Sequence, residues 1–244
     1  MTITSAPTPQ RSGRPEQHFS PSLIIALIAV LALGAIGVAM ALPGGHLSPG
    51  SGIQGSGVAA TQARAVPSFT GLDLAGSNEV TVVVGAPRSV VVHADTNLIS
   101  HVTTRVVNGT LVIADTGNYT SHAPMNVAVS VPSLTALKLS GDGQVSVTGI
   151  GVPRLTVTVS GSGQLSAAGA VTRLDVTLSG AGRAALSQLS ARDVHAVLTG
   201  SGLIQVTATS SLNAAVPGTG LIMYTGNPAQ VVTSVTGTGT VTAG

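Results

Sequence analysis

An aspartate and a histidine at equivalent positions of two segments, each containing a Gly-x-Gly sequence, could form an acid–base pair. Asp175 and His195 each lie five positions before the first glycine of a Gly-x-Gly sequence. Three more charged residues lie seven positions before such a sequence: Arg154, Arg173 and Asp193. If the segments stack, these five side chains form one ionic patch with His195 between the two aspartates. Such a patch could orient a polar ligand or exchange protons with a substrate.

A purely structural interpretation of the same patch is also open. Charges one coil apart on the outside of a stacked fold form surface salt bridges, which contribute under about 1 kcal/mol each and fix the register of the coils. Glycoside hydrolysis usually needs two carboxylates facing one bond, whereas Asp142, Asp175 and Asp193 occupy three different positions of the repeat. We predict no catalytic residue. The candidate binding patch comprises Arg154, Arg173, Asp175, Asp193 and His195.

A second group of titratable residues comprises His93, Asp95 and His101. The His-x-Asp spacing places two potential ligands on one face of a strand, but no third ligand follows at a spacing typical of metal sites. Asp142, in the sequence GDGQ, resembles part of a calcium turn, yet the aspartate does not recur in the other repeats. The sequence therefore predicts neither a metal site nor a cofactor.

Repeats of about 19 residues would position all of these side chains. Apolar residues recur at every second position on both sides of each glycine pair, which is the pattern of β-strands interrupted by a corner. A unit this short cannot bury its apolar face alone, so successive units must stack. The repeat predicts an all-β fold, a parallel β-helix. Its glycine pairs begin at Gly141, Gly161, Gly180, Gly200, Gly218 and Gly237, with spacings of 20, 19, 20, 18 and 19.

The glycine pairs are predicted to form the corners of this fold. Glycine permits a positive φ there and prevents collisions between side chains on successive coils. Because no helix follows the pairs, they do not form a phosphate-binding loop. A hydroxyl side chain precedes five of the six pairs, and we expect the stacked hydroxyls to have a structural role. The residues before the pairs are Ser140, Ser160, Ser179, Thr199, Pro217 and Thr236.

The composition agrees with thin, stacked β-structure and excludes several functions. The apolar residues are mostly Val, Ala, Leu and Ile, and the 244 residues include 31 Gly, two Phe, two Tyr and no Trp. Charged residues make up 7% of the chain, against about a quarter in ordinary proteins. The net charge of +2 rests on scattered cations, so nucleic acid is not an expected partner. Without cysteine, the chain has no disulfide, thiol nucleophile or Cys-ligated zinc.

The amino-terminal region predicts a membrane anchor over residues 21–42. Twenty residues from Leu23 to Leu42 have no charged or strongly polar side chain, and as a helix they would span about 30 Å, the thickness of a bilayer core. Arg11 and Arg14 precede this segment, so the positive-inside rule leaves the amino terminus in the cytoplasm and exports the rest of the chain. The alternative is a cleaved signal peptide, for which Ala39-Met40-Ala41 has the small-x-small form of a cleavage site.

The regions on either side of the predicted anchor have no hydrophobic period. Residues 1–20 are expected to be a disordered cytoplasmic tail. Residues 43–64 are rich in Gly, Ser and Pro and are expected to be a flexible linker. These assignments predict a single-pass protein of the cell membrane whose bulk is extracytoplasmic.

The remainder of the chain carries a series of motifs in a distinctive order. Residues 69–113 contain a Phe followed by a Leu-x-Leu-x-Gly strand, a Val-rich strand ending at Gly85, and the stretches SVVVHADTNLISHV and VVNGTLVI, after which the Ser-Gly-x-Gly repeats begin. Asn108-Gly109 is a hairpin signal. Over residues 66–243 the sequence resembles the head GIN domain of putative auto-transporter adhesins. The resemblance implies a right-handed β-helical fold and cell-surface exposure, and it supplies no catalytic residue.

These observations predict one head domain over residues 65–244, with a less regular first part over 65–130 and six repeats over 131–244. The expected function is non-enzymatic: a structural or adhesin-like module that contacts cell-envelope polysaccharide or a surface protein. A polysaccharide-processing enzyme and an envelope sensor remain as alternatives. The last coil, Thr233–Val241, would end in a strand edge without an obvious cap, and the oligomeric state stays open.

Overall fold

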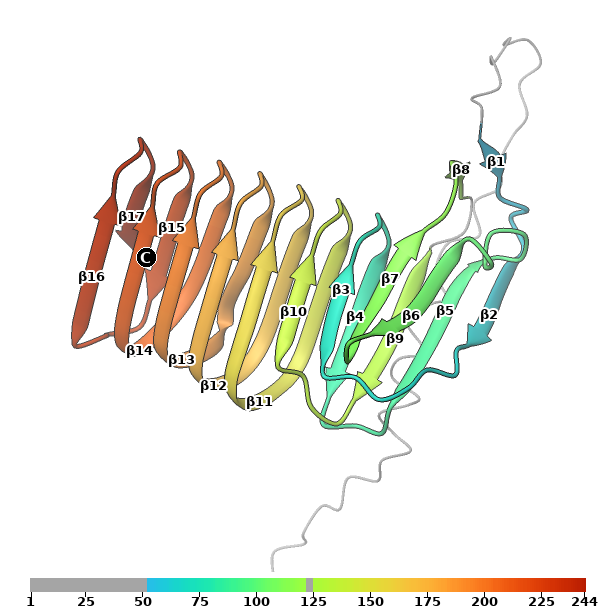
Figure 1. The fold of residues 1–244 in the computed structure, drawn as a ribbon, viewed down its shortest axis with the longest axis horizontal. Coiled ribbons are helices and arrows are strands. Elements are labelled where there is room, and N and C mark those ends of the chain that lie inside the picture. Colours follow the sequence, from blue (N-terminus) through green and yellow to red (C-terminus); the bar gives the residue numbers. More distant parts are fainter. Residues whose placement is uncertain (1–51, 122–124) are drawn as a thin grey trace, which may run out of the picture. The chain divides into compact units, whose positions relative to one another are not determined.

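The described part of the protein is all-β. The computed structural model describes residues 52–121 and 125–244, which lie in one compact unit, Pro49–Gly244. Most of this unit is a parallel β-solenoid of about five turns (Figure 1). Its strands are β3 (Gly71–Leu74), β4 (Glu79–Val84), β10 (Ala136–Leu139), β11 (Gln144–Val159), β12 (Gln164–Leu178), β13 (Arg183–Leu198), β14 (Leu203–Val216), β15 (Leu221–Thr225), β16 (Gln230–Val235) and β17 (Thr240–Ala243).

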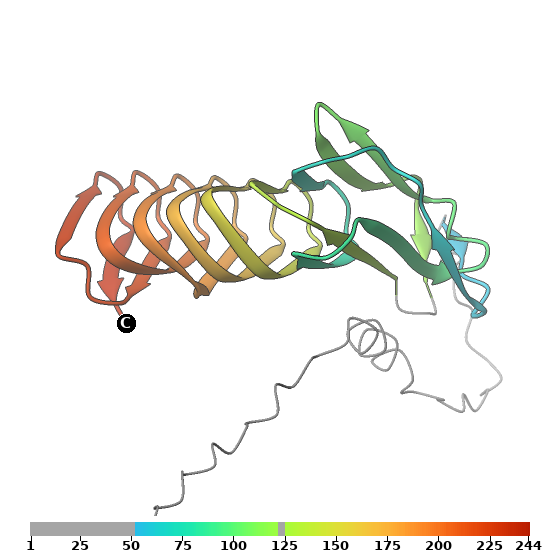
Figure 2. The same cartoon turned by 90° about the horizontal axis from the view of Figure 1, so that it is seen from below.

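The coils are stacked in the register that the repeat predicts. Val157 of β11 pairs with Val176 of β12, which pairs with Ala196 of β13, and each of these lies four residues before a glycine pair. The strands β11 to β14 run from one face of the solenoid onto the next, as the yellow to orange ribbons of Figure 2 show. Six glycine corners delimit five full turns, so the predicted repeat is confirmed, with about five complete coils in place of six.

The core is a set of stacked apolar columns inside the solenoid. On one face the column through Leu137, Val157 and Val176 is at most 1% exposed, and on the next face Val145 and Leu165 are fully buried. Burying a side chain of this size stabilises the fold by about 1.5–3 kcal/mol. Successive coils lie about 4.8 Å apart, so each buried side chain contacts the equivalent side chains of the coils before and after it. This close spacing suits small and β-branched residues.

The glycine corners are explained by close packing of backbones. A Cβ atom at Gly200 would lie 1.9 Å from the carbonyl oxygen of Gly180, and one at Gly161 would lie 2.0 Å from that of Gly141. The first glycine of every pair meets the preceding coil in this way, and none of the pairs has a positive φ. The expected collision is therefore confirmed, whereas the expected positive φ is wrong, because the corner is built from ordinary backbone conformations.

The less regular first part, residues 65–130, contains an insertion in the first coil. After β4 the chain forms strands that cover β3 and β4, and it then returns to the solenoid at β10. β7 pairs in parallel with β3, and β9 pairs in parallel with β4. β6 and β7 form the hairpin predicted at Asn108-Gly109, where both residues have a positive φ. The inserted strands are β5 (Ser89–Asp95), β6 (Val102–Val107), β7 (Thr110–Asp115), β8 (Tyr119–Thr120) and β9 (Asn126–Val131).

The flexible linker expected over residues 43–64 is wrong for its carboxy-terminal part. Ala59–Ala63 form β2, which pairs antiparallel with β5, and Ile53–Gln54 form β1, which pairs with β8. β2 is mostly exposed, so no hydrophobic period marks it in the sequence. Backbone hydrogen bonds to β5 hold it in place, and such bonds depend little on side-chain type.

The predicted tail and membrane anchor, residues 1–20 and 21–42, lie outside the described residues. Within residues 52–121 and 125–244, no helix has the length and hydropathy that crossing a bilayer requires.

Asp115 closes the corner between β3 and β4, which contains Gly76, Ser77 and Asn78. This corner precedes the six Gly-x-Gly corners and is the first of the solenoid. At later corners an amide of the glycine pair donates to the preceding coil, as Gly182 N does to Gly161 O at 3.1 Å. The first corner has no such coil before it. The Asp115 carboxylate accepts hydrogen bonds there from the Ser77 amide at 2.8 Å, the Ser77 hydroxyl at 3.2 Å and the buried Asn78 side chain. Burial and the negative charge of Asp115 raise the pKa of Tyr119 nearby.

The corner packing predicts a large effect of one methyl group. Gly200→Ala places a Cβ against a backbone carbonyl that cannot move without displacing its coil, so we expect the free energy of unfolding of residues 49–244 to fall by about 3 kcal/mol. Gly151→Ala is the control, because a Cβ at Gly151 of β11 meets nothing within 4 Å; it should be neutral or stabilise by under about 1 kcal/mol. Urea unfolding followed by circular dichroism measures both. Equal effects would contradict the packing explanation.

The cap at the first corner predicts that Asp115→Ala destabilises residues 49–244 by about 1–3 kcal/mol, since the Ser77 amide and the buried Asn78 side chain lose their acceptor. Asp142→Ala is a matched control at the next corner, where the exposed carboxylate accepts one bond from the Ser162 amide at 3.2 Å. Its cost should stay below about 0.5 kcal/mol. The same urea experiment compares them, and a control as costly as Asp115→Ala would rule out the capping role.

Candidate functional site

The five residues of the candidate binding patch lie on neighbouring coils. Arg154 is on β11, Arg173 and Asp175 are on β12, and Asp193 and His195 are on β13. Arg154 pairs in register with Arg173, and Arg173 with Asp193; Asp175 pairs with His195. The two columns inferred from the spacing are therefore present on one face of the solenoid.

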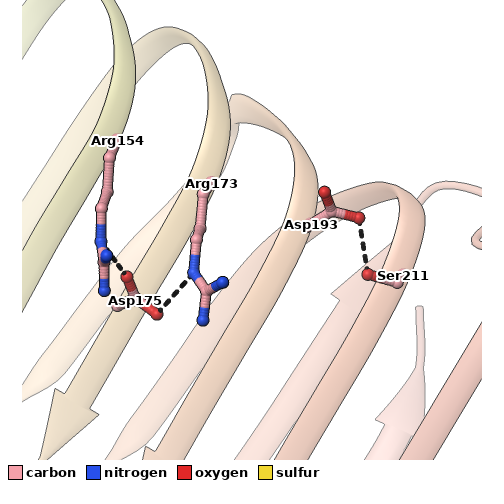
Figure 3. Close-up of polar contacts among 5 residues, drawn as sticks. All are labelled: Arg154, Arg173, Asp175, Asp193 and Ser211. Atoms are coloured by element: carbon pink, nitrogen blue, oxygen red, sulfur yellow. Dashed lines mark hydrogen bonds and ion pairs between the residues drawn. The ribbon is translucent and has the colours of Figure 1, made fainter.

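Asp175 is the centre of the patch. Its two carboxylate oxygens accept from different arginines, one from Arg154 Nε at 2.8 Å and the other from Arg173 Nε at 3.3 Å (Figure 3). The arginine side chains are 64% and 55% exposed, whereas that of Asp175 is only 17% exposed. The carboxylate is thus covered by its partners, and the outer nitrogens of both guanidinium groups face solvent.

Asp193 and His195 do not join this cluster. Asp193 accepts a hydrogen bond from Ser211 Oγ at 2.7 Å, on the next coil, and its other oxygen lies 4.0 Å from Arg192 Nε. In the described residues, His195 makes no hydrogen bond or ion pair. His195 is flanked by the two aspartates as the spacing predicted, because it is in register with Asp175 and lies two residues after Asp193. Neither carboxylate bonds to it, however: Asp175 accepts from the two arginines and Asp193 from Ser211.

This geometry favours the structural interpretation of the patch over proton exchange. Both oxygens of Asp175 accept charge-assisted bonds from arginines, and no hydrogen bond joins this carboxylate to His195 as an acid–base pair would need. The Arg–Asp–Arg bridge spans two coils and so fixes their register, as a surface ladder does. What the patch still offers to a ligand is the pair of exposed guanidinium edges.

The second titratable group is dispersed. His93 Nδ1 lies 2.9 Å from Thr61 Oγ1, and His101 Nδ1 lies 2.8 Å from the Thr116 carbonyl. Asp95 is fully buried and accepts from Ser121 Oγ at 2.8 Å. Within residues 52–121 and 125–244, no three His, Cys, Asp or Glu side chains come together as a metal site would need.

A shallow groove along the glycine corners was not anticipated from the sequence. Two adjoining hollows of about 380 and 570 Å³ share Ala181, Gly182 and Arg183, and together they extend from Glu79 on β4 to Thr240 on β17. Their lining comes from three columns: the middle residue of each corner, the second glycine, and the residue after it. The second glycine is buried at the base of the groove, and a Cβ there would meet the preceding coil: at Gly202 it would lie 2.2 Å from the Gly182 carbonyl oxygen and 2.8 Å from Leu178 Cδ2.

The chemistry of the groove changes along its length. Near β4 it carries the carboxylate of Glu79 and the exposed amides of Gln144 and Gln164, whereas near β15 it is lined by the half-buried side chains of Leu203 and Leu221. The sequence signal that could have located it is the column three places after the first glycine, which reads Gln, Gln, Arg, Leu, Leu and Thr from residue 144 to residue 240.

The fold and these surfaces define a parallel β-solenoid with a polar outer surface of low charge. Residues 68–228 match the family model described as "Putative auto-transporter adhesin, head GIN domain". Since the match covers more than half of the chain, the protein belongs to this family, as the ordered motifs predicted.

Solved structures support the same fold. A protein from Bacteroides fragilis described as a putative adhesin is 22% identical, with a TM-score of 0.66, over 79% of this chain and 100% of that one. A protein from Parabacteroides distasonis described as a putative lipid binding protein is 19% identical, with a TM-score of 0.51, over 79% of this chain and 99% of that one. At these identities the likeness extends to the fold alone. A search of curated proteins finds no significant match.

The geometry of the patch predicts a small structural effect. Asp175→Ala removes the bridge and leaves Arg154 and Arg173 as like charges on adjacent coils. We expect the free energy of unfolding of residues 49–244 to fall by about 1 kcal/mol or less, with the difference from wild type shrinking in high salt. His195→Ala should change it by under about 0.5 kcal/mol. Urea unfolding at low and high salt tests this, and a loss of several kcal/mol at His195 would contradict it.

Proposed function

We propose that this protein is a membrane-anchored surface module that binds linear, uncharged polysaccharide and does not cleave it. The adhesin description of its family supports a binding role. The observation that carries the choice of ligand is the corner groove, which is long, open and lined by amide, hydroxyl and aliphatic groups. Sugars present hydroxyl groups for such polar side chains and C–H faces for side chains such as Leu203 and Leu221.

The groove suits a polymer better than a small ligand. Small-molecule sites are usually deep and bury most of the ligand, whereas this groove is shallow and repeats its lining at each coil. With no Trp and two Phe in the chain, it offers little aromatic surface for stacking. Each hydrogen bond adds only about 0.5–1.5 kcal/mol net, so binding must accumulate over several coils. A chain that extends along the axis provides that multivalency.

A neutral polymer fits the charges better than an acidic one. The polar end of the groove carries Glu79 and Asp142, with Arg183 as the cation among its lining residues, and Arg183 donates to Gln205 Oε1 at 2.5 Å. An anionic polymer would meet two carboxylates before it reached that guanidinium group. The enzymatic alternative would have to use the same two carboxylates, and the assay for released sugar described below tests it.

The proposed location follows from residues 21–42, which lie outside the described residues. Their twenty-residue apolar stretch, preceded by Arg11 and Arg14, supports a single-pass anchor with a cytoplasmic amino terminus and an extracytoplasmic head. On this reading the head is presented to the cell envelope or to the outside, where polysaccharide is available.

The groove predicts which side chains determine affinity. Replacing both Gln144 and Gln164 by Ala removes two amides that are neighbours in register. We expect binding of purified residues 49–244 to isolated envelope polysaccharide, and to a soluble neutral glucan, to weaken about tenfold. Retention on the insoluble polymer and titration calorimetry with the glucan measure this, and released reducing sugar is assayed in parallel.

The matched control is the double substitution Thr158→Ala with Thr177→Ala. These two threonines are also neighbours in register on β11 and β12, but they are not among the residues that line the groove. This variant should bind as the wild type does. Loss of binding in the control alone would place the site outside the groove. No binding by the wild type would contradict the polysaccharide proposal, and released sugar would contradict its non-enzymatic part.

A further inference from the structure

The last coil leaves both apolar side chains and backbone edges open. β16 pairs with β14 alone, and β17 with β15 alone, so each strand has one free edge. All six residues of β16 are exposed. In residues 52–121 and 125–244, half of the exposed large hydrophobic residues lie on this strand: Val231 at 42%, Val232 at 60% and Val235 at 45%.

Two of these valines belong to the core columns. Val231 continues the column of Leu212, and Val235 continues that of Val216, each in register. Leu212 and Val216 are 1% and 0% exposed. The exposure of the valines therefore does not come from an outward orientation; the interior of the solenoid is open at this end. An open end with free strand edges is a template for pairing with another chain.

This edge lacks the features by which proteins prevent such pairing. Natural edge strands carry charged residues, prolines or bulges, but β16 reads QVVTSV and β17 reads TVTA. From Val194 to Gly244 the chain has no Asp, Glu, Lys or Arg. Two copies of this end can approach without charge repulsion, and a charged partner would gain no ion pair with it.

The other end of the solenoid differs in kind. There β3 and β4 are covered by β7 and β9, whose outer neighbours β6 and β5 run antiparallel, and Asp115 satisfies the first corner. Head-to-tail stacking of copies would need a matching parallel edge at this end. The contact that remains is between two copies of the same edge, which is isologous and closes at two subunits.

We propose that this protein forms a two-fold dimer in which the last coils of two copies meet end to end, β16 and β17 of one copy extending the sheets of the other. When the two-fold axis is perpendicular both to the solenoid axis and to β16, the two facing copies of β16 are antiparallel, so free amides of one copy meet free carbonyls of its partner. The same contact covers Val231, Val235 and the partly buried Val241.

The test measures the mass of residues 49–244 by sedimentation equilibrium from low micromolar to submillimolar concentration. We expect a monomer–dimer equilibrium. Thr233→Lys places a charge in an interior column at the open end, where Thr233 continues the column of Ala214; it should raise the dissociation constant about tenfold or more. Val232→Lys adds the same charge to the outer face of β16 and should change the constant by less than about twofold.

A second measurement covers the case in which Thr233→Lys fails to fold, which circular dichroism would reveal. Because the chain has no cysteine, Thr233→Cys gives one thiol at the proposed contact, and mild oxidation should yield a covalent dimer. Ser162→Cys, on a central corner, should not. A wild type that stays monomeric, a dimer weakened equally by both lysines, efficient cross-linking at Ser162 or assembly beyond the dimer would each overturn the proposal.

Discussion

The distance between successive coils is the constraint on which the rest of the structure depends. Backbone hydrogen bonds hold one coil against the next at the spacing of strands in a sheet, and this leaves no room for a side chain where the chain turns sharply. A Cβ at Gly180 would lie 2.2 Å from the carbonyl oxygen of Gly161. The first residue of the corner must therefore be glycine in every coil, and the strand residues next to the aligned corners are aligned with them. Differences in coil length are taken up away from the corners, where the register shifts between Val147 and Ile150 and between Leu186 and Ser190.

That alignment governs the surface as much as the core. Outward side chains of one column stand one strand spacing apart, so a ligand or a salt bridge meets the same position of successive coils. Arg154 and Arg173 reach one carboxylate for this reason, and Gln144 and Gln164 stand side by side in the groove. The uncharged surface has a related origin, because identical charges in one column would repel each other at this spacing.

The parts of the fold that follow from a period could be predicted, and those that depend on single contacts could not. The columns of Val157, Val176 and Ala196 were visible as a two-residue alternation anchored at each glycine pair. The covering strands β5 to β9 occur once, and Asp115 acts across a sequence distance of 38 residues. In the patch, the spacing placed Asp193 correctly on its coil, but its choice of Ser211 over His195 depends on a rotamer that no spacing encodes.

The insertion between β4 and β10 makes the pairing of the first coil far less local in sequence than that of the other coils. Later coils join residues about 19 apart, whereas the pairing of β3 with β10 joins residues 65 apart, as in the hydrogen bond from Thr135 to Thr70. Closing the longer loop costs about 1 kcal/mol more in chain entropy. Pairing that starts among the regular coils and spreads to the irregular end meets the smaller barrier first. We therefore expect the first coil of the solenoid to be completed last, although it is synthesised before the regular coils.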